Sequence, residues 1–190
     1  MADVNKIDGQ SIASVGDYPG KIKPAIVRWV VPGWYAQQLF TIAAVAGRIY
    51  YTPIFVTETT TYIRIGINVA AGAVGTADLR IYNWSGGLPG SQVLSAGTVD
   101  TTNIAVLEIV INQQLTRGYY FLAVRCSAAP SLRGFDGTTA ITPPVGGQYP
   151  DQTDAINRVN MTVDAAMADP APAPAAAVAA GFCFVRLREN

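Results

Sequence analysis

One stretch of the sequence constrains the fold more than any other. Residues 48–132 consist of short runs in which apolar and polar residues alternate, and each run is closed by a turn signal. The run at 61–69 places its apolar members at every second position: Ile63, Ile65, Ile67 and Val69. A period of two is typical of a strand with one buried face, and short strands at this spacing indicate an antiparallel sandwich or barrel.

The run at 119–124 differs from the others because all six of its residues are apolar or aromatic, Tyr-Tyr-Phe-Leu-Ala-Val. A strand that is apolar on both faces is covered on both sides, so we predict a central strand here. Helical periodicity is nearly absent from the chain. The sequence therefore predicts an all-β fold: an antiparallel, jelly-roll-like β-sandwich with an extended N-terminal arm and long C-terminal loops.

The chain divides into an arm and one domain, with residues 1–24 as the arm and residues 25–190 as the sandwich. The arm is polar and interrupted by Gly and Pro, and its apolar residues are widely spaced: Val4, Ile7, Ile12 and Val15. Regular apolar anchors are unusual in a purely solvating tail, so we predict that these four side chains contact a neighbouring subunit. A disordered tail is the alternative.

The C-terminal part of the domain combines a long excursion with a final strand. Residues 133–181 are rich in loop signals, and the part from Asp164 to Gly181 is rich in Ala and Pro, which favours an extended conformation. Residues 182–187 are apolar enough to be predicted as a last strand of the sandwich. Long loops in a compact domain are usually functional or lie against a partner, so we expect the excursion to contact neighbouring subunits.

Composition argues against most chemistry. The chain has no histidine, which excludes Ser-His-Asp and Cys-His catalysis within it. Lys and Arg number 13, as do Asp and Glu, and no basic cluster stands out, so we expect neither nucleic-acid nor membrane binding. Acidic residues at 136, 151 and 154 are interpreted as solvated loop acids. We expect no enzyme activity, no catalytic residue, no metal site and no cofactor.

Two cysteines, Cys126 and Cys183, each lie in an apolar, strand-like run. We interpret them as buried thiols, with a disulfide between neighbouring strands as the alternative. The first residues lack an apolar run after a basic start, and no stretch reaches the roughly 18 apolar residues of a membrane span. We therefore expect synthesis and folding in a cytoplasm.

Three aromatic residues are candidates for stacking on a sugar: Tyr82, Trp84 and Tyr149. Tyr82 is predicted to point outward from its strand, Trp84 lies beside the Gly86-Gly87 turn, and Tyr149 lies in the excursion. The alternative is that these rings cover the ends of the sandwich or an interface.

The central block resembles a β-sandwich domain of surface proteins of tailed bacteriophages. The matching segments cover about half of the chain and keep their order: 50–55, 62–66, 79–83, 87–90, 96–100, 115–122 and 129–130. The arm is similar to phage virion proteins in Lys-Ile-Asp-Gly at 6–9 and Ile-Ala at 12–13. The resemblance implies a virion component without enzymatic activity.

Within that class the chain departs from a typical fibre, because it has one domain, no heptads and no shaft repeat. We therefore expect a capsid decoration (cement) protein on the virion surface, made in the host cytoplasm. Its expected partners are the major capsid protein and copies of itself, as a trimer at three-fold positions. The alternative is a short tail fibre or tail-tip protein that binds a host surface glycan. A carbohydrate-binding module of a cellular protein is a third possibility.

Overall fold

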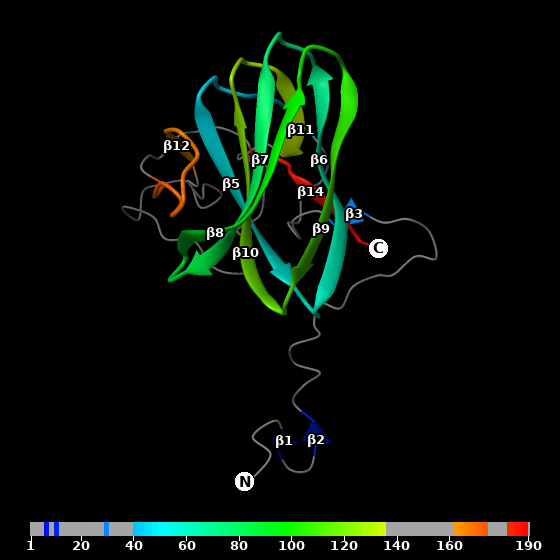
Figure 1. Cartoon of the computed structure of the whole chain (residues 1–190), viewed down its shortest axis with the longest axis vertical. Coiled ribbons are helices and arrows are strands. Elements are labelled where there is room, and N and C mark those ends of the chain that lie inside the picture. The colour runs from blue at the N-terminus through cyan, green and yellow to red at the C-terminus, as the bar shows by residue number, and fades with distance from the viewer. Residues whose placement is uncertain are drawn as a thin grey trace.

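The computed structural model describes residues 6–7, 10–11, 29–30, 40–135, 162–174 and 182–189 (Figure 1). In these residues every regular element is a β-strand, and two antiparallel sheets pack face to face. The prediction of an all-β sandwich is confirmed.

One sheet has five strands, and the predicted central strand lies in its middle. In spatial order the strands are β12 (Thr162–Asp164), β5 (Arg48–Val56), β10 (Gly118–Cys126), β7 (Thr76–Ser85) and β8 (Leu88–Asp100). β10 is paired on both sides, with β5 and with β7. Its residues 120–124 are all buried, as expected for a strand that is apolar on both faces.

The other sheet has seven strands and contains the end of the chain. Its main path is β13 (Phe182–Cys183), β11 (Ser131–Phe135), β6 (Thr60–Ala71), β14 (Arg186–Glu189) and β3 (Trp29–Val30). β4 (Phe40–Ala43) pairs with β11, and β9 (Ala105–Leu115) pairs with β6. β1 (Lys6–Ile7) and β2 (Gln10–Ser11) form a separate two-stranded pair.

The strands from β4 to β11 follow jelly-roll connectivity. Four of them run in the order β4-β11-β6-β9 in one sheet, and the other four in the order β5-β10-β7-β8 in the other. Apart from the β7–β8 hairpin, each step along the chain crosses from one sheet to the other, which is how two Greek keys wrap into a jelly roll. The topology thus agrees with the jelly-roll-like fold predicted from the sequence.

The main core fills the space between the sheets with aliphatic side chains that alternate along the strands. Completely buried members are Ile65, Ile67, Val69, Leu79, Ile81, Leu122, Val124 and Leu187. The predicted phase of β6 is wrong at its start, because Tyr62 is completely buried in this core and Ile63 is only half-buried. The register shifts between Tyr62 and Arg64 against both neighbours of β6, and such an irregularity changes which side chain faces inward.

The predicted last strand at 182–187 is two short strands rather than one. β13 ends at Cys183, and β14 begins at Arg186 and extends to Glu189. β13 pairs with β11, while β14 lies between β6 and β3. The end of the chain therefore completes the seven-stranded sheet.

Candidate functional site

The outer face of the five-stranded sheet carries a second apolar cluster, separate from the inter-sheet core. Its members are completely buried: Ile49, Tyr51, Tyr82, Phe121 and Ala123. They come from the three neighbouring strands β5, β10 and β7, at positions that alternate with the core residues. The rings of Tyr51 and Tyr82 meet edge to face, with centroids 5.9 Å apart.

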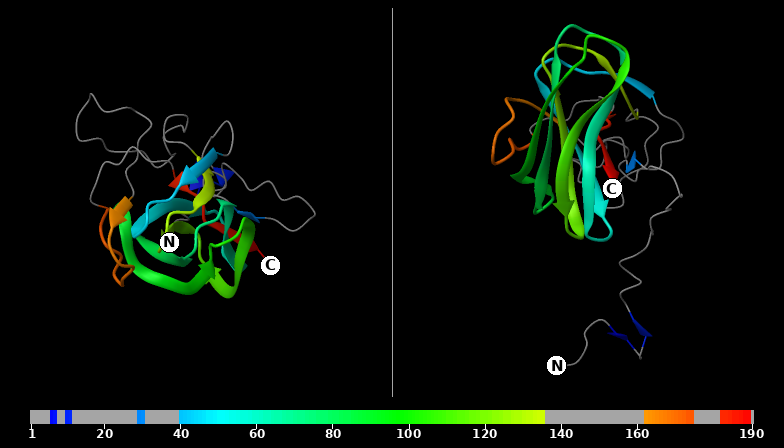
Figure 2. Two further views of the ribbon diagram at one scale, coloured as in Figure 1. Left: turned by 90° about the horizontal axis from the view of Figure 1, so that it is seen from above. Right: turned by 45° about the vertical axis from the view of Figure 1, so that its right-hand side comes forward.

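A segment from far along the chain covers this cluster. Residues 162–174, called the strap below, begin as the edge strand of the five-stranded sheet and then lie against its outer face; they are orange in both views of Figure 2. The strap begins as β12, in which Val163 is directly opposite Ile49 of β5. Its apolar side chains on the cluster are Val163, Ala165, Met167 and Ala171.

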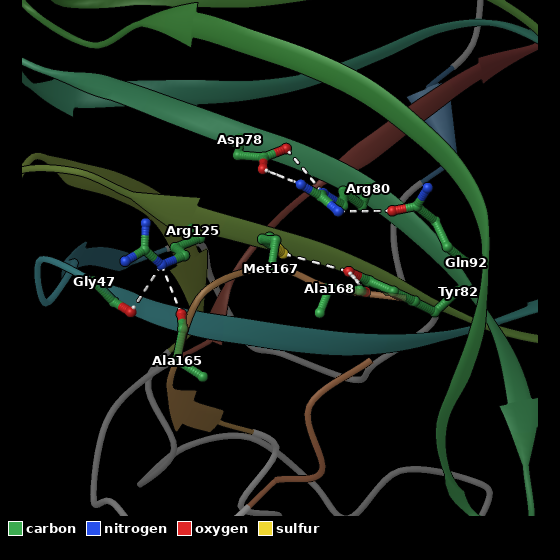
Figure 3. Close-up of polar contacts among 9 residues, drawn as sticks. All are labelled: Gly47, Asp78, Arg80, Tyr82, Gln92, Arg125, Ala165, Met167 and Ala168. Carbon is green, nitrogen blue, oxygen red and sulfur yellow. Dashed lines mark hydrogen bonds and ion pairs between the residues drawn. The ribbon is translucent and has the colours of Figure 1, made fainter. Parts of the chain in front are cut away.

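Side chains of the sheet bind backbone carbonyl groups of the strap (Figure 3). The Tyr82 hydroxyl donates to the Ala168 carbonyl at 3.0 Å, and the Arg125 Nε donates to the Ala165 carbonyl at 2.7 Å. The Tyr51 hydroxyl donates to the Pro172 carbonyl at 3.0 Å. Three buried or half-buried donors therefore hold a segment whose side chains at those points are small.

The far end of the strap reaches the edge strand β8 on the other side of the sheet. The Ala171 amide donates to the Gly90 carbonyl at 2.9 Å, and the Gln92 amide donates to Asp169 Oδ1 at 2.9 Å. Gln92 itself accepts a hydrogen bond from Arg80 at 2.7 Å, and Arg80 is also paired with Asp78 (Figure 3). The strap thus spans the sheet from β5 to β8.

Charge and burial support the same arrangement. Arg48 binds Asp164 through two contacts, of 2.7 and 3.0 Å, and this hydrogen bonding holds the pKa of the Asp164 carboxyl below its usual value. Burial raises the pKa of Tyr51 and of Tyr82, because it disfavours the phenolate. Both hydroxyls therefore remain neutral hydrogen-bond donors to the strap.

The outer face continues toward the Arg117-Gly118 turn as a row of rings: Phe55, Tyr119 and Trp84. Neighbouring ring centroids are 4.7 Å apart for Phe55 and Tyr119 and 5.1 Å apart for Tyr119 and Trp84. Trp84 also stacks on Phe121, with centroids 5.2 Å apart and planes 4° apart. Tyr119 is 39% exposed, and Leu88, the first residue of β8, is 45% exposed.

The structure removes one of the three predicted sugar-stacking residues. Tyr82 does point outward from the sandwich, but the strap buries it completely, so the prediction that it contacts a glycan is wrong in this arrangement. Trp84 is half-buried with one ring face against Phe121. Tyr149 lies outside the described residues.

Three of the four predicted contact residues of the arm lie outside the described residues: Val4, Ile12 and Val15. The fourth, Ile7, lies in β1. Part of the Ala- and Pro-rich segment packs on the chain's own sheet, through Ala165, Met167 and Ala171, and its contact with neighbouring subunits stays a prediction. The sequence signal for this second layer was the run 119–124, whose outer residues needed a cover. Its cover could not be identified from the sequence because it comes from far along the chain: even Ala165 and Arg125, which are hydrogen-bonded, are 40 positions apart.

Cys126 and Cys183 are both free and buried in the inter-sheet core, so the disulfide alternative is not adopted. Among the described residues, His, Cys, Asp and Glu form no group of three that could hold a metal ion. Within that same part of the chain, no helix has the length and hydropathy to span a membrane. No protein-family model matches the chain, and no curated protein matches it as a relative.

Proposed function

We propose that the protein is a structural component of a bacteriophage virion, namely a capsid decoration protein that stabilises the head lattice. The proposal starts from the resemblance of the central block to phage surface domains. The jelly-roll topology is compatible with it, because the fold provides a rigid platform with two large sheet faces. The proposed partners are the major capsid protein and further copies of the chain in a trimer.

The observation that carries the proposal is the apolar surface of β9. Ile104, Val106 and Val110 are 73%, 54% and 71% exposed, on and just before this strand. Among the described strands, β9 pairs with β6 alone, so it is an edge strand. A long apolar edge is a template for association, and soluble proteins usually protect such edges with charge or proline. The only charged residue of β9 is Glu108, which is paired with Arg64.

The test replaces both exposed valines of β9, as Val106→Lys with Val110→Lys. Lysines on an edge strand oppose pairing with another subunit, so we expect capsid occupancy to fall at least tenfold without loss of thermal stability. Val74→Lys is the matched control, because Val74 is also exposed but lies outside the strands. Unchanged occupancy of the double variant would exclude β9 as the contact.

The arm and the copy number test the location independently. Deletion of residues 1–20 should abolish capsid attachment and leave the sandwich folded, as judged by circular dichroism. Full occupancy of capsids by the truncated chain would contradict the role of Val4, Ile7, Ile12 and Val15. Quantitative mass spectrometry of purified virions gives the copy number: a decoration protein is present in hundreds of copies, and a tail protein in a handful.

A short tail fibre or tail-tip protein that binds a host glycan is the second candidate. The observation in its favour is the exposed ring of Tyr119 beside Trp84. It ranks second because Tyr82 is buried and one face of Trp84 is occupied. Trp84→Ala should slow adsorption to host cells if this candidate is right, and an unchanged rate would count against it.

A further inference from the structure

We propose that the row of Phe55, Tyr119 and Trp84 is a docking site for an extended, proline-containing segment of another polypeptide. The inference goes beyond the proposed virion role and does not depend on it. It rests on three features of the outer face of the five-stranded sheet: what the strap binds there, how the row continues that surface, and which donors the row leaves available.

The strap shows which chemistry this face recognises. Its end alternates proline and alanine, with Pro170, Pro172 and Pro174 in sequence. Proline favours an extended backbone and cannot donate a backbone N–H, so carbonyl groups of such a segment are left to accept hydrogen bonds. Tyr51 and Tyr82 supply donors to two strap carbonyls while their rings pack below it. Aromatic surfaces with polar ring tips bind proline-rich segments by the same physics.

The row is continuous with this intramolecular interface. Tyr119 and Phe121 are alternate residues of β10 and therefore lie on the same face. Phe55 is directly opposite Tyr119 in the register of β5 and β10. Trp84 joins the two halves, because its ring contacts both Tyr119 and Phe121. One aromatic surface thus has a half that the strap covers and a half in which Tyr119 is exposed while Phe55 and Trp84 are half-buried.

The half that the strap does not cover has hydrogen-bond donors without a partner, whereas the donors of the covered half bind the strap. In the described part of the chain, the Tyr119 hydroxyl and the Trp84 indole N–H have no hydrogen-bond partner, unlike the hydroxyls of Tyr51 and Tyr82. The three side chains of the row carry no charge. A neutral segment with free carbonyl groups therefore matches the row better than an acidic or basic one.

Ring geometry favours a peptide over a sugar. Stacking on a sugar requires an exposed ring face. Here one face of Trp84 lies against Phe121, and Tyr119 is tilted by 42° and 39° against its two neighbours. Tilted rings of this kind present edges as well as faces to a partner. Proline-rich segments bind to aromatic-lined surfaces in peptide-binding domains.

The test is titration of the full chain with a short acetylated peptide of alternating Ala and Pro, followed by isothermal calorimetry and by NMR of the aromatic side chains. The matched probe alternates Ala and Ser at the same length. We expect saturable binding of the Ala-Pro peptide alone, with shifts at Tyr119 and Trp84. Tyr119→Phe removes only a hydroxyl and should weaken binding about fivefold, as expected for the loss of one hydrogen bond.

Two further variants make the result decisive. Trp84→Phe should also weaken binding, whereas Val110→Ser, on the other sheet, should leave it unchanged. The proposal is overturned if the Ala-Pro peptide does not bind, if the Ala-Ser peptide binds equally well, or if Tyr119→Phe and Trp84→Phe bind as the unaltered chain does. None of these outcomes bears on the location in the virion.

Discussion

Two cysteines, one from each sheet, lie in the same core. Cys126 ends β10 and Cys183 ends β13, and both are completely buried among aliphatic side chains. Burial raises the pKa of the Cys126 thiol to about 11, because the thiolate would lose its hydration. The pKa of Cys183 is raised as well, by burial first and by its charge interaction with Cys126 second. Both residues therefore act as small apolar groups.

We predict that neither thiol reacts with a disulfide reagent in the folded protein at pH 8. The thiolate is the reactive species, and both burial and the raised pKa values suppress it. Both thiols should react once the chain is unfolded in guanidinium. Absorbance of the released aromatic thiol measures the reaction. One reactive thiol in native buffer would place that cysteine outside the core.

At the scale of the element, the strap depends on the sheet beneath it for most of its contacts. It contains one three-residue strand, and its remaining contacts are single hydrogen bonds and small apolar side chains. The sheet beneath stabilises the strap, because the rings of Tyr51 and Tyr82 would be exposed to solvent without it. The Arg48–Asp164 pair adds a contact at the start of the strap, where Asp164 is itself exposed.

We predict that Tyr82→Phe loosens the strap without unfolding the sandwich. The variant keeps the buried ring and removes the hydrogen bond to the Ala168 carbonyl, a loss of about 1 kcal/mol. Hydrogen exchange of residues 162–174, followed by mass spectrometry, should become several times faster, while exchange in β10 stays slow. Tyr119→Phe is the matched control, and it should leave strap exchange unchanged. Equal exchange in both variants would show that the Tyr82 hydroxyl does not hold the strap.

At the scale of the whole molecule, the last strand occupies a position beside β6 that β11 leaves open. β14 pairs with β6 across residues 62–66, which β11 does not reach, because β11 pairs with β6 only near Val69 and Ala71. Leu187 from β14 is completely buried in the inter-sheet core. The final residues of the chain therefore close a gap in the seven-stranded sheet.

We predict that Leu187→Ala lowers the free energy of unfolding by about 2–5 kcal/mol, the usual cost of deleting a fully buried leucine side chain. Urea denaturation followed by fluorescence measures the change. Val74→Ala serves as the control, because Val74 is exposed and its truncation should cost no more than about 0.5 kcal/mol. A loss for Leu187→Ala as small as that of the control would mean that β14 is not part of the core.

The strands were predictable wherever period and turn chemistry agree. The alternation in β7 and β9 placed Leu79, Ile81 and Ile111 on the buried side, as the structure has them. The apolar run in β10 identified the central strand. The phase at Tyr62 was not predictable, because the register shift depends on pairing with β9 and β14 together. The apolar–polar pattern within one strand does not show which neighbouring strand will force an extra residue into the pairing.

In the candidate site, single residues were predictable from the sequence but their arrangement was not. Trp84 was recognisable as an unusual aromatic beside a turn, but its row with Tyr119 and Phe55 exists only because β5, β10 and β7 pair in one register. The identity of the cover over Tyr51 and Tyr82 was equally out of reach, since prolines make a segment extended without saying where it lies.

By itself, the sequence determined the strands, their turns and the buried face of most of them, because these follow from side-chain alternation and from the backbone preferences of Gly and Pro. Tertiary structure alone decided which strands became neighbours, that the strap covers its own sheet, and that Tyr119 in the row of rings beside it stays exposed. The physical reason is that these contacts join residues far apart in the chain, so their free energy depends on shape complementarity between whole sheet faces rather than on any local pattern.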